Sequence, residues 1–375
     1  MSNPANIARL GIKELRSLAR EPLLIGLILY VFTIGIYMAA TAMPDTLYQA
    51  ALGIVDEDGS PLSARIKAAF YPPQFMVPRP VALAEVDPGL DVGTFTFVLD
   101  IPPDFQRDVL AGRVPSIQLS VDATRMRQAY TGSGYIQQIV QSEVNEFVQR
   151  YRGSPAPAVD LALRVRFNPN LEPSWMGALM ETINHVTMLS LILAGAALIR
   201  EREHGTIEHL LVMPVTPAEI MLAKIWATGL VVLVAAACAL RFVVQGALQI
   251  PIEGSVALFL GCAALHLFAT TSMGIFMATV ARSMPQFGLL LILTMMPLNM
   301  LSGGFTPRES MPEIVQWIML LAPTTPFILA GQAILFRGAG LAVVWPQALA
   351  LLVIGGVFFA ISLRRFRRMI GQLAG

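Results

Sequence analysis

Long apolar runs recur along the chain, and shorter polar stretches separate them. Six runs reach or approach the roughly 20 residues that a helix needs to cross the hydrocarbon core of a bilayer. The predicted membrane-spanning helices are 22–43, 176–199, about 221–245, 255–280, 286 to about 301, and about 344–363. Residues 44–175 form the one long interval without such a run, and the pattern predicts a separate domain there.

Within 44–175, short β-like segments alternate with helical ones, which favours a small α/β domain with one sheet. The clearest strand is 93–101, where apolar and polar residues alternate. Other strands are expected at 51–56, 81–86, 116–122 and 159–167, and helices at 60–70, 102–111 and 129–151. The acidic run 56–58 is interpreted as a turn, and TGSG at 131–134 as the flexible start of the long helix. The interval holds neither His nor Cys, which favours a docking or gating domain over an enzyme.

The arm before the first span, residues 1–21, is predicted to be an amphipathic helix at a membrane surface. Its basic residues recur every three or four positions and share one face: Arg9, Lys13, Arg16 and Arg20. Apolar and small residues are expected on the opposite arc: Ile7, Ala8, Gly11, Ile12, Leu15, Leu18 and Ala19. The same pattern also fits an arm that only fixes the topology of the chain.

Composition supports the membrane assignment. The chain is 55% hydrophobic and 14% charged, whereas soluble domains carry about a quarter charged residues. Basic residues gather in the N-terminal arm, after the second and fourth spans and in the C-terminal tail, and these lie on one side if there are six spans. The positive-inside rule then predicts that both termini are cytoplasmic and that residues 44–175 are extracytoplasmic.

Ionisable residues inside spans are candidates for a translocation path. Glu181 and His185 lie one helical turn apart in the second span, beside Asn184, and His266 lies midway along the fourth. Lys224 and Arg241 lie near opposite ends of the third span, from which long side chains can reach the interface.

Several chemistries find no support in the sequence. The net charge is +1, so nothing points to nucleic acid, and Cys238 and Cys262 both fall inside apolar runs. His204 and His209 are five residues apart and match no zinc motif, so no metal site is predicted. A phosphate-binding G-x-x-x-x-G-K-[ST] loop is absent from the sequence. The chain is therefore expected to bind no cofactor itself, and any ATP and Mg²⁺ would belong to a separate subunit or to a fused part outside this sequence.

The segment 200–217 combines charge with apolar residues. After four charged residues, Gly205 permits a turn and Thr206 can cap a short helix. Apolar residues at helical spacing follow, and Pro214 and Pro217 end the segment. Such a helix could enter a groove in a partner or lie on lipid headgroups.

The sequence EREHGTIEHLLVMPVTPAEIMLAKIW at 201–226 resembles the loop after the second span of ABC-2-type transporter permeases. It is especially similar to the YhhJ-like subfamily of bacterial inner-membrane permeases, which has a large domain between spans one and two. IVDEDGS at 54–60, FVLDIPPDF at 97–105, LSGGFTPRESMP at 301–312 and APTTPF at 322–327 also resemble this subfamily.

The resemblance implies an α-helical membrane protein with six transmembrane helices, an inserted extracytoplasmic α/β domain, and outer re-entrant helices at 304–337 before the last span. It also implies a connecting helix at 1–21 and a cytosolic coupling helix at 201–213 that contacts an ATPase subunit. The residues expected to make that contact are Glu201, Arg202, Glu203, Gly205, Thr206, Ile207, Leu210, Leu211 and Met213.

The implied function is that of a non-enzymatic permease subunit of an ATP-driven efflux transporter for amphiphilic or drug-like compounds. Its expected partners are an ABC ATPase, a second permease copy or a paralogue in a dimer, and a periplasmic membrane-fusion adaptor. One alternative is mechanotransmission, in which ATP hydrolysis moves the outer domain and no substrate crosses. Another is a secondary carrier, which would need paired acidic residues at mid-membrane and inverted repeats.

Overall fold

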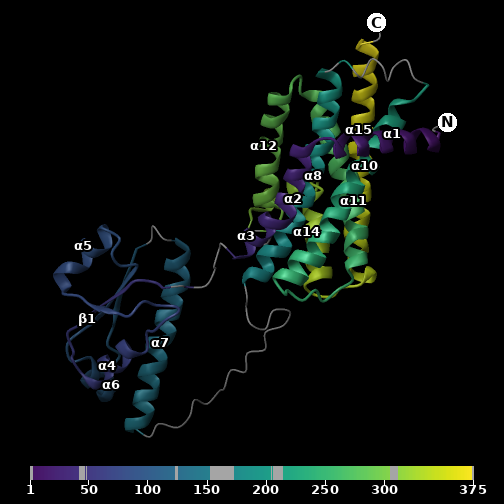
Figure 1. The fold of residues 1–375 in the computed structure, drawn as a ribbon. Helices are drawn as coiled ribbons and strands as arrows, with labels where there is room; N and C mark the ends of the chain where they lie inside the picture. Colours follow the sequence, from purple (N-terminus) through teal and green to yellow (C-terminus); the bar gives the residue numbers. More distant parts are fainter. Residues whose placement is uncertain are drawn as a thin grey trace. The chain divides into compact units, whose positions relative to one another are not determined.

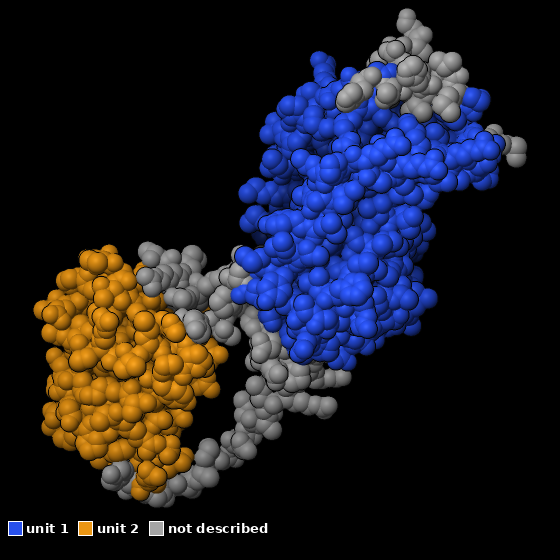
Figure 2. All heavy atoms as spheres, in the orientation of Figure 1, with its two compact units in different colours: residues 1–42, 165–375 blue, residues 43–164 orange. Residues whose placement is uncertain are grey.

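The computed structural model describes residues 3–41, 47, 49–122, 126–152, 173–203, 205, 214–304 and 311–373. The chain divides into two compact units, coloured separately in Figure 2. The helical unit comprises residues 1–42 and 165–375, and the sheet unit comprises residues 43–164. Each unit is described by itself.

Within the described residues, the helical unit contains six helices that are long and apolar enough to cross a membrane, as predicted. The first span runs through α2 (Pro22–Tyr30), the π-helical η1 (Val31–Gly35) and α3 (Ile36–Thr41). The others are α8 (Pro173–Glu203), α10 (Pro217–Cys238) continued by the π-helical η4 (Ala239–Ala247), α11 (Val256–Val280), α12 (Met284–Leu301) and α15 (Leu341–Leu373). Between the last two lie α13 (Glu313–Met319) and α14 (Thr324–Leu335), which are bent by 88° relative to each other.

Two helices, α8 and α11, form the centre of this bundle (Figure 1). A Cβ atom on Gly274 of α11 would lie 2.8 Å from the carbonyl oxygen of Leu191 in α8, so only glycine permits this close backbone approach. α11 also packs against α10, α14 and α15. By contrast, α12 and α15 leave most of their apolar surface exposed in this single chain.

The N-terminal arm forms α1 (Pro4–Ala19), which packs along the start of α10. The indole Nε1 of Trp226 donates to the carbonyl oxygen of Ile7 at 3.1 Å. A Cβ atom on Gly11 would lie 2.1 Å from the same indole ring. The apolar arc predicted for this helix is therefore partly wrong: Leu10 and Gly11 are buried, whereas Ile12 is 44% exposed. A protein neighbour selects the buried face, and helical spacing alone does not reveal that neighbour.

The sheet unit holds a four-stranded mixed sheet in the order β2-β1-β3-β4. The strands are β1 (Leu52–Asp56), β2 (Arg79–Pro80), β3 (Phe97–Ile101) and β4 (Gln118–Val121). β1 runs parallel to β2 and β3, and β4 runs antiparallel to β3. The helices are α4 (Pro61–Ala68), α5 (Val86–Asp91), α6 (Phe105–Ala111) and α7 (Met126–Arg152). The apolar core lies between the sheet and α4, α6 and α7.

Three predictions for this unit are wrong in detail. The strand expected at 81–86 is instead a 3₁₀ turn, η2 (Leu83–Glu85), followed by the start of α5, because pairing ends just after Pro80 and the Glu85 side chain accepts from the Ala82 amide. TGSG at 131–134 lies inside α7, where Gly132 contacts Phe97 and lets the helix approach the sheet. α6 begins at Phe105 rather than at residue 102. The strand expected at 159–167 lies outside the described residues.

The acidic turn after β1 has a structural role. The Asp56 carboxylate accepts from the amides of Asp58 and Gly59 at 3.2 and 2.9 Å, and from the Ser63 hydroxyl at 3.0 Å. It also pairs with Lys67. Partial burial alone would raise the pKa of Asp56, but these donors and the Lys67 charge outweigh burial and hold the pKa below its ordinary value.

Gly11→Ala is expected to loosen the docking of α1. Alanine favours a helix over glycine by about 1 kcal/mol, but the added methyl group collides with Trp226. We expect the free energy of unfolding in detergent to fall by about 1–3 kcal/mol and Trp fluorescence to shift. Gly26→Ala is the matched control, because no atom lies within 4 Å of a Cβ placed there. Equal stability of the two variants would contradict this packing.

Asp56→Asn is expected to destabilise the sheet unit by about 1–3 kcal/mol at neutral pH, because it weakens four contacts to one carboxylate. The folded-state pKa of Asp56 is lowered, so its contribution is present above the unfolded-state value and is lost as the pH falls through the folded-state value. The free energies of unfolding of the full-length wild type and Asp56→Asn, measured between pH 7 and pH 3, should therefore converge as the pH falls. Glu57→Gln, at an exposed neighbour, should follow wild type throughout.

Candidate functional site

A dense network of polar contacts lies where α8 ends and α10 begins. α10 starts with a capping box, in which the Glu219 amide donates to the Thr216 hydroxyl at 3.3 Å and the Thr216 amide donates to the Glu219 carboxylate at 2.6 Å. Four of the predicted coupling residues are described here: Glu201, Arg202, Glu203 and Gly205. Thr206, Ile207, Leu210, Leu211 and Met213 lie outside the described residues.

A buried ammonium group is the centre of this region. Lys224 of α10 is 2% exposed, and its Nζ lies 3.0 Å from Glu14 Oε1 of α1 and 2.8 Å from Glu201 Oε2 of α8. The prediction that Lys224 extends to the membrane interface is therefore wrong, because two carboxylates from neighbouring helices give it partners inside the protein. The Glu201 side chain points inward to this cluster and is 13% exposed.

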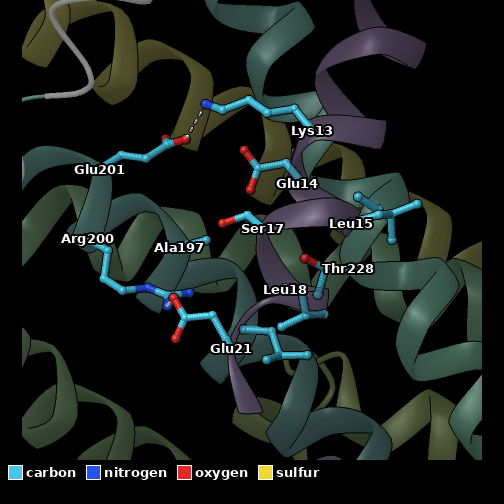
Figure 3. Close-up of a pocket in the computed structure, with 12 residues that line it drawn as sticks. Lys13, Glu14, Leu15, Ser17, Leu18, Glu21, Ala197, Arg200, Glu201 and Thr228 are labelled. Carbon is cyan, nitrogen blue, oxygen red and sulfur yellow. Dashed lines mark hydrogen bonds and ion pairs between the residues drawn. The ribbon is translucent and has the colours of Figure 1, made fainter. Parts of the chain in front are cut away.

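Further polar contacts join the same elements. Lys13 Nζ lies 3.5 Å from Glu201 Oε1, the ion pair drawn in Figure 3. Arg200 of α8 pairs with Glu21 at the junction of α1 and α2. The amide of Asn3, the residue that caps α1, donates to Glu219 Oε1 at 2.5 Å. The start of α1 is thus bonded to the capped start of α10, and its middle and end are bonded to α8.

The end of α8 is also bonded to the turn between α11 and α12. Arg202 Nη2 donates to the Ala281 carbonyl oxygen at 2.7 Å, and the Met284 amide donates to Glu203 Oε1 at 2.9 Å. Gly205 then takes a left-handed conformation, with φ of +68°, as is common just after a helix end. A displacement of the segment after Glu203 would therefore be transmitted both to α1 and to the α11–α12 turn.

The structure brings Glu181 and His185 together, as their spacing predicts. Glu181 Oε1 lies 3.7 Å from His185 Nδ1, and Asn184 donates to Glu181 Oε2 at 3.3 Å. The His185 ring meets Phe32 edge to face, and a Cβ on Gly35 would approach its Nε2 to 3.0 Å. The pair therefore lies where α8 contacts the π-helical part of the first span.

His266 has separate neighbours. Its Nε2 lies 2.8 Å from the Thr187 hydroxyl and its Nδ1 lies 3.2 Å from the Pro323 carbonyl oxygen. Because that carbonyl can only accept, Nδ1 donates to it, and Nε2 is free to accept from Thr187. The ring is fully buried and stacks on Phe327 at 4.1 Å between centroids. These contacts are those of a core residue that joins α8, α11 and α14.

Glu14, Glu21 and Glu219 were not predicted from the sequence, although Lys224 indicates that a carboxylate such as Glu14 should lie near it. Lys224 lies about two turns inside an apolar helix, and a cation there needs an anion. The sequence offers several glutamates, and only the docking of α1 decides between them. Among the described residues, no group of His, Cys, Asp and Glu is arranged to hold a metal ion.

Comparison with known proteins adds the following findings. The family model described as ABC-2 family transporter protein matches residues 22–364. The chain is 59% identical to the inner membrane transport permease YhhJ of Escherichia coli K12, over the full length of both chains. It is 28% identical to the probable multidrug ABC transporter permease YbhR of the same strain, over 96% of this chain and 97% of that one. It is 24% identical to the probable multidrug ABC transporter permease YbhS of the same strain, over 90% of this chain and 91% of that one.

Lys224→Met is expected to destabilise the helical unit strongly, because it leaves Glu14 and Glu201 buried without their shared cation. We expect the free energy of unfolding in detergent to fall by about 3–5 kcal/mol. Lys13→Met is the control and should cost less than about 1 kcal/mol, since Lys13 is half-exposed. Adding Glu14→Gln and Glu201→Gln to Lys224→Met should restore part of the loss. Similar stabilities for the two single variants would argue against the cluster.

Proposed function

The chain belongs to the ABC-2 family of transporter proteins, and on this basis we propose that it is the membrane-spanning permease subunit of an ATP-driven exporter in a bacterial inner membrane. The carrying observation is 59% identity to an inner membrane transport permease over the full length of both chains. ABC-2 permeases generally work with an ATPase subunit, and the ATPase of this transporter is proposed to be a separate polypeptide that holds ATP and Mg²⁺.

In the proposed topology both termini are cytoplasmic and the sheet unit is extracytoplasmic. The segment 201–213 then faces the cytosol and contacts the ATPase through the exposed Glu203, through Gly205 and through the residues that follow. Glu201 acts differently, because its carboxylate is engaged by Lys224. The bent pair α13 and α14, with 88° between its helices, supports a re-entrant segment at 304–337.

Two copies of the permease, or one copy and a paralogue, are proposed to form the transport path between them. The large exposed apolar surfaces of α12 and α15 in the single chain leave room for such a partner as well as for lipid. Closure of the ATPase subunits on ATP would push the coupling segment. The push would then pass to α1 through Glu201 and Lys224, and to the α11–α12 turn through Arg202 and Glu203.

The proposed substrate is an amphiphilic or drug-like compound, taken from the cytosol or the inner leaflet and released outward. Two relatives named as probable multidrug permeases support this class. Glu181 and His185 are proposed to line the path, since they form the polar pair beside the π-helical part of the first span. His266, packed on all sides, is better suited to holding the bundle together. The sheet unit is proposed to dock a periplasmic adaptor or to guard the exit.

Transport assays test this proposal directly. The permease and its ATPase are reconstituted in sealed vesicles, and ATP-dependent movement of fluorescent amphiphiles is measured. Movement that needs both subunits supports the proposal. ATP-dependent stimulation of an outer partner, with no compound moved, would favour mechanotransmission instead. Movement that persists without the ATPase would favour a secondary carrier.

Arg202→Ala is expected to uncouple ATP hydrolysis from transport. The variant loses the hydrogen bonds that join the end of α8 to the carbonyls of Ala278 and Ala281. We expect ATPase activity to persist while transport per ATP falls about tenfold, as for a loss of about 1.4 kcal/mol of coupling. Arg282→Ala removes an exposed charge from the same turn and should leave the ratio unchanged. A normal ratio in Arg202→Ala would contradict this route.

A further inference from the structure

A cavity of about 320 Å³ lies between α1, α8 and α10. Figure 3 shows Ser17 of α1 pointing toward Ala197 of α8 across this cavity. Two ion pairs lie on either side of these small residues: Lys13 of α1 pairs with Glu201 of α8, and Glu21, between α1 and α2, pairs with Arg200 of α8. The helices are therefore held together at two levels while space remains between them.

The charges around the cavity are balanced. Its lining carries two cations, Lys13 and Arg200, and three carboxylates, Glu14, Glu21 and Glu201. Lys224 does not line the cavity but contacts Glu14 and Glu201, which brings the cations to three. A lone anion would meet the carboxylates, and a lone cation would meet the lysines and the arginine. The cavity therefore suits a polar group that carries both signs of charge. The side chains of Lys13 and Glu21 are 53% and 40% exposed, so they can exchange partners with such a group.

A second, apolar groove of about 610 Å³ lies farther along α10, between this helix and the first span. Ala227 and Thr228 belong to the cavity, and the groove residues of this helix, from Leu230 to Val243, follow at helical spacing. At 1.5 Å per residue the groove is about 20 Å long, which exceeds the roughly 15 Å depth of one leaflet. Along α10 the charged cavity comes first and the apolar groove second, which matches the order of head and acyl chain in a phospholipid.

We propose that this surface binds one phospholipid with a zwitterionic head, whose head occupies the cavity and one of whose acyl chains occupies the groove. The phosphate accepts from Lys13 and Arg200, and a primary ammonium group donates to Glu14 and Glu21. A head with a primary amine, as in phosphatidylethanolamine, fits best, because a quaternary ammonium group has no N–H to donate. An anionic head such as phosphatidylglycerol takes Arg200 from Glu21 and gives that carboxylate no ammonium group in exchange, whereas Glu14 and Glu201 keep Lys224. The assignment does not depend on transport.

The test measures which lipid the purified full-length chain retains. Delipidated protein is incubated with vesicles that contain equal amounts of phosphatidylethanolamine, phosphatidylcholine and phosphatidylglycerol. The protein is then repurified, and the lipids bound per chain are counted by mass spectrometry. We expect about one retained phosphatidylethanolamine, less phosphatidylcholine and least phosphatidylglycerol. Ser17→Leu places bulk in the cavity and should lower retention about tenfold. Ala19→Leu, exposed on the same helix but outside the cavity, should retain lipid as wild type does.

A charge variant tests the head assignment separately. Glu21→Gln removes one carboxylate, so the ratio of bound phosphatidylethanolamine to phosphatidylglycerol should fall by up to about fivefold, the size expected for one exposed ion pair. This ratio decides the outcome if Ser17→Leu alters folding. The proposal is overturned if wild type retains phosphatidylglycerol as well as phosphatidylethanolamine, or if Glu21→Gln leaves the ratio unchanged.

Discussion

A lysine without access to water imposes the strongest constraint on the helical unit. Burying an ammonium group is costly unless carboxylates of good geometry compensate it, and Lys224 obtains them from Glu14 and Glu201. Because those carboxylates come from α1 and α8, the cation fixes three helices relative to one another. The docking of the N-terminal arm, the capped start of α10 and the anchored end of α8 all surround this group.

This arrangement makes one end of the bundle mechanically continuous. The segment between α8 and α10 leaves a helix whose last residues are bonded to α1 and to the α11–α12 turn. It returns into a helix whose first turn is bonded to Asn3. Force applied to the end of α8 or to the start of α10 therefore also acts on α1, and at the end of α8 on the α11–α12 turn. For a permease of this family, such continuity suits a subunit driven by a partner.

How much the sequence could predict depended on the range of each interaction. Membrane-spanning helices depend on local apolar length, so all six were predictable. The strands β1, β3 and β4 were predicted as well, β3 from alternation of apolar and polar residues. The buried face of α1 depends on Trp226, more than 200 residues away, and helical spacing could not select Leu10 over Ile12. The partners of Lys224 depended on the same docking. The expected contact helix, with Ile207, Leu210 and Leu211, lies outside the described residues and stays a prediction.

The π-helical segments η1 and η4 change the direction in which side chains point around their helices. A π turn accommodates an extra residue relative to an α turn. Residues after η1 and residues within η4 therefore face another direction than a helical wheel continued from Pro22 or Pro217 would assign. Ile36 and Ala40 are buried on the far side of η1. A substitution scan across either span therefore needs one helical wheel for the α-helical part before the π turn and another from the π turn onward. A single-residue deletion inside either π turn also has a different steric effect from a deletion in the flanking α-helix.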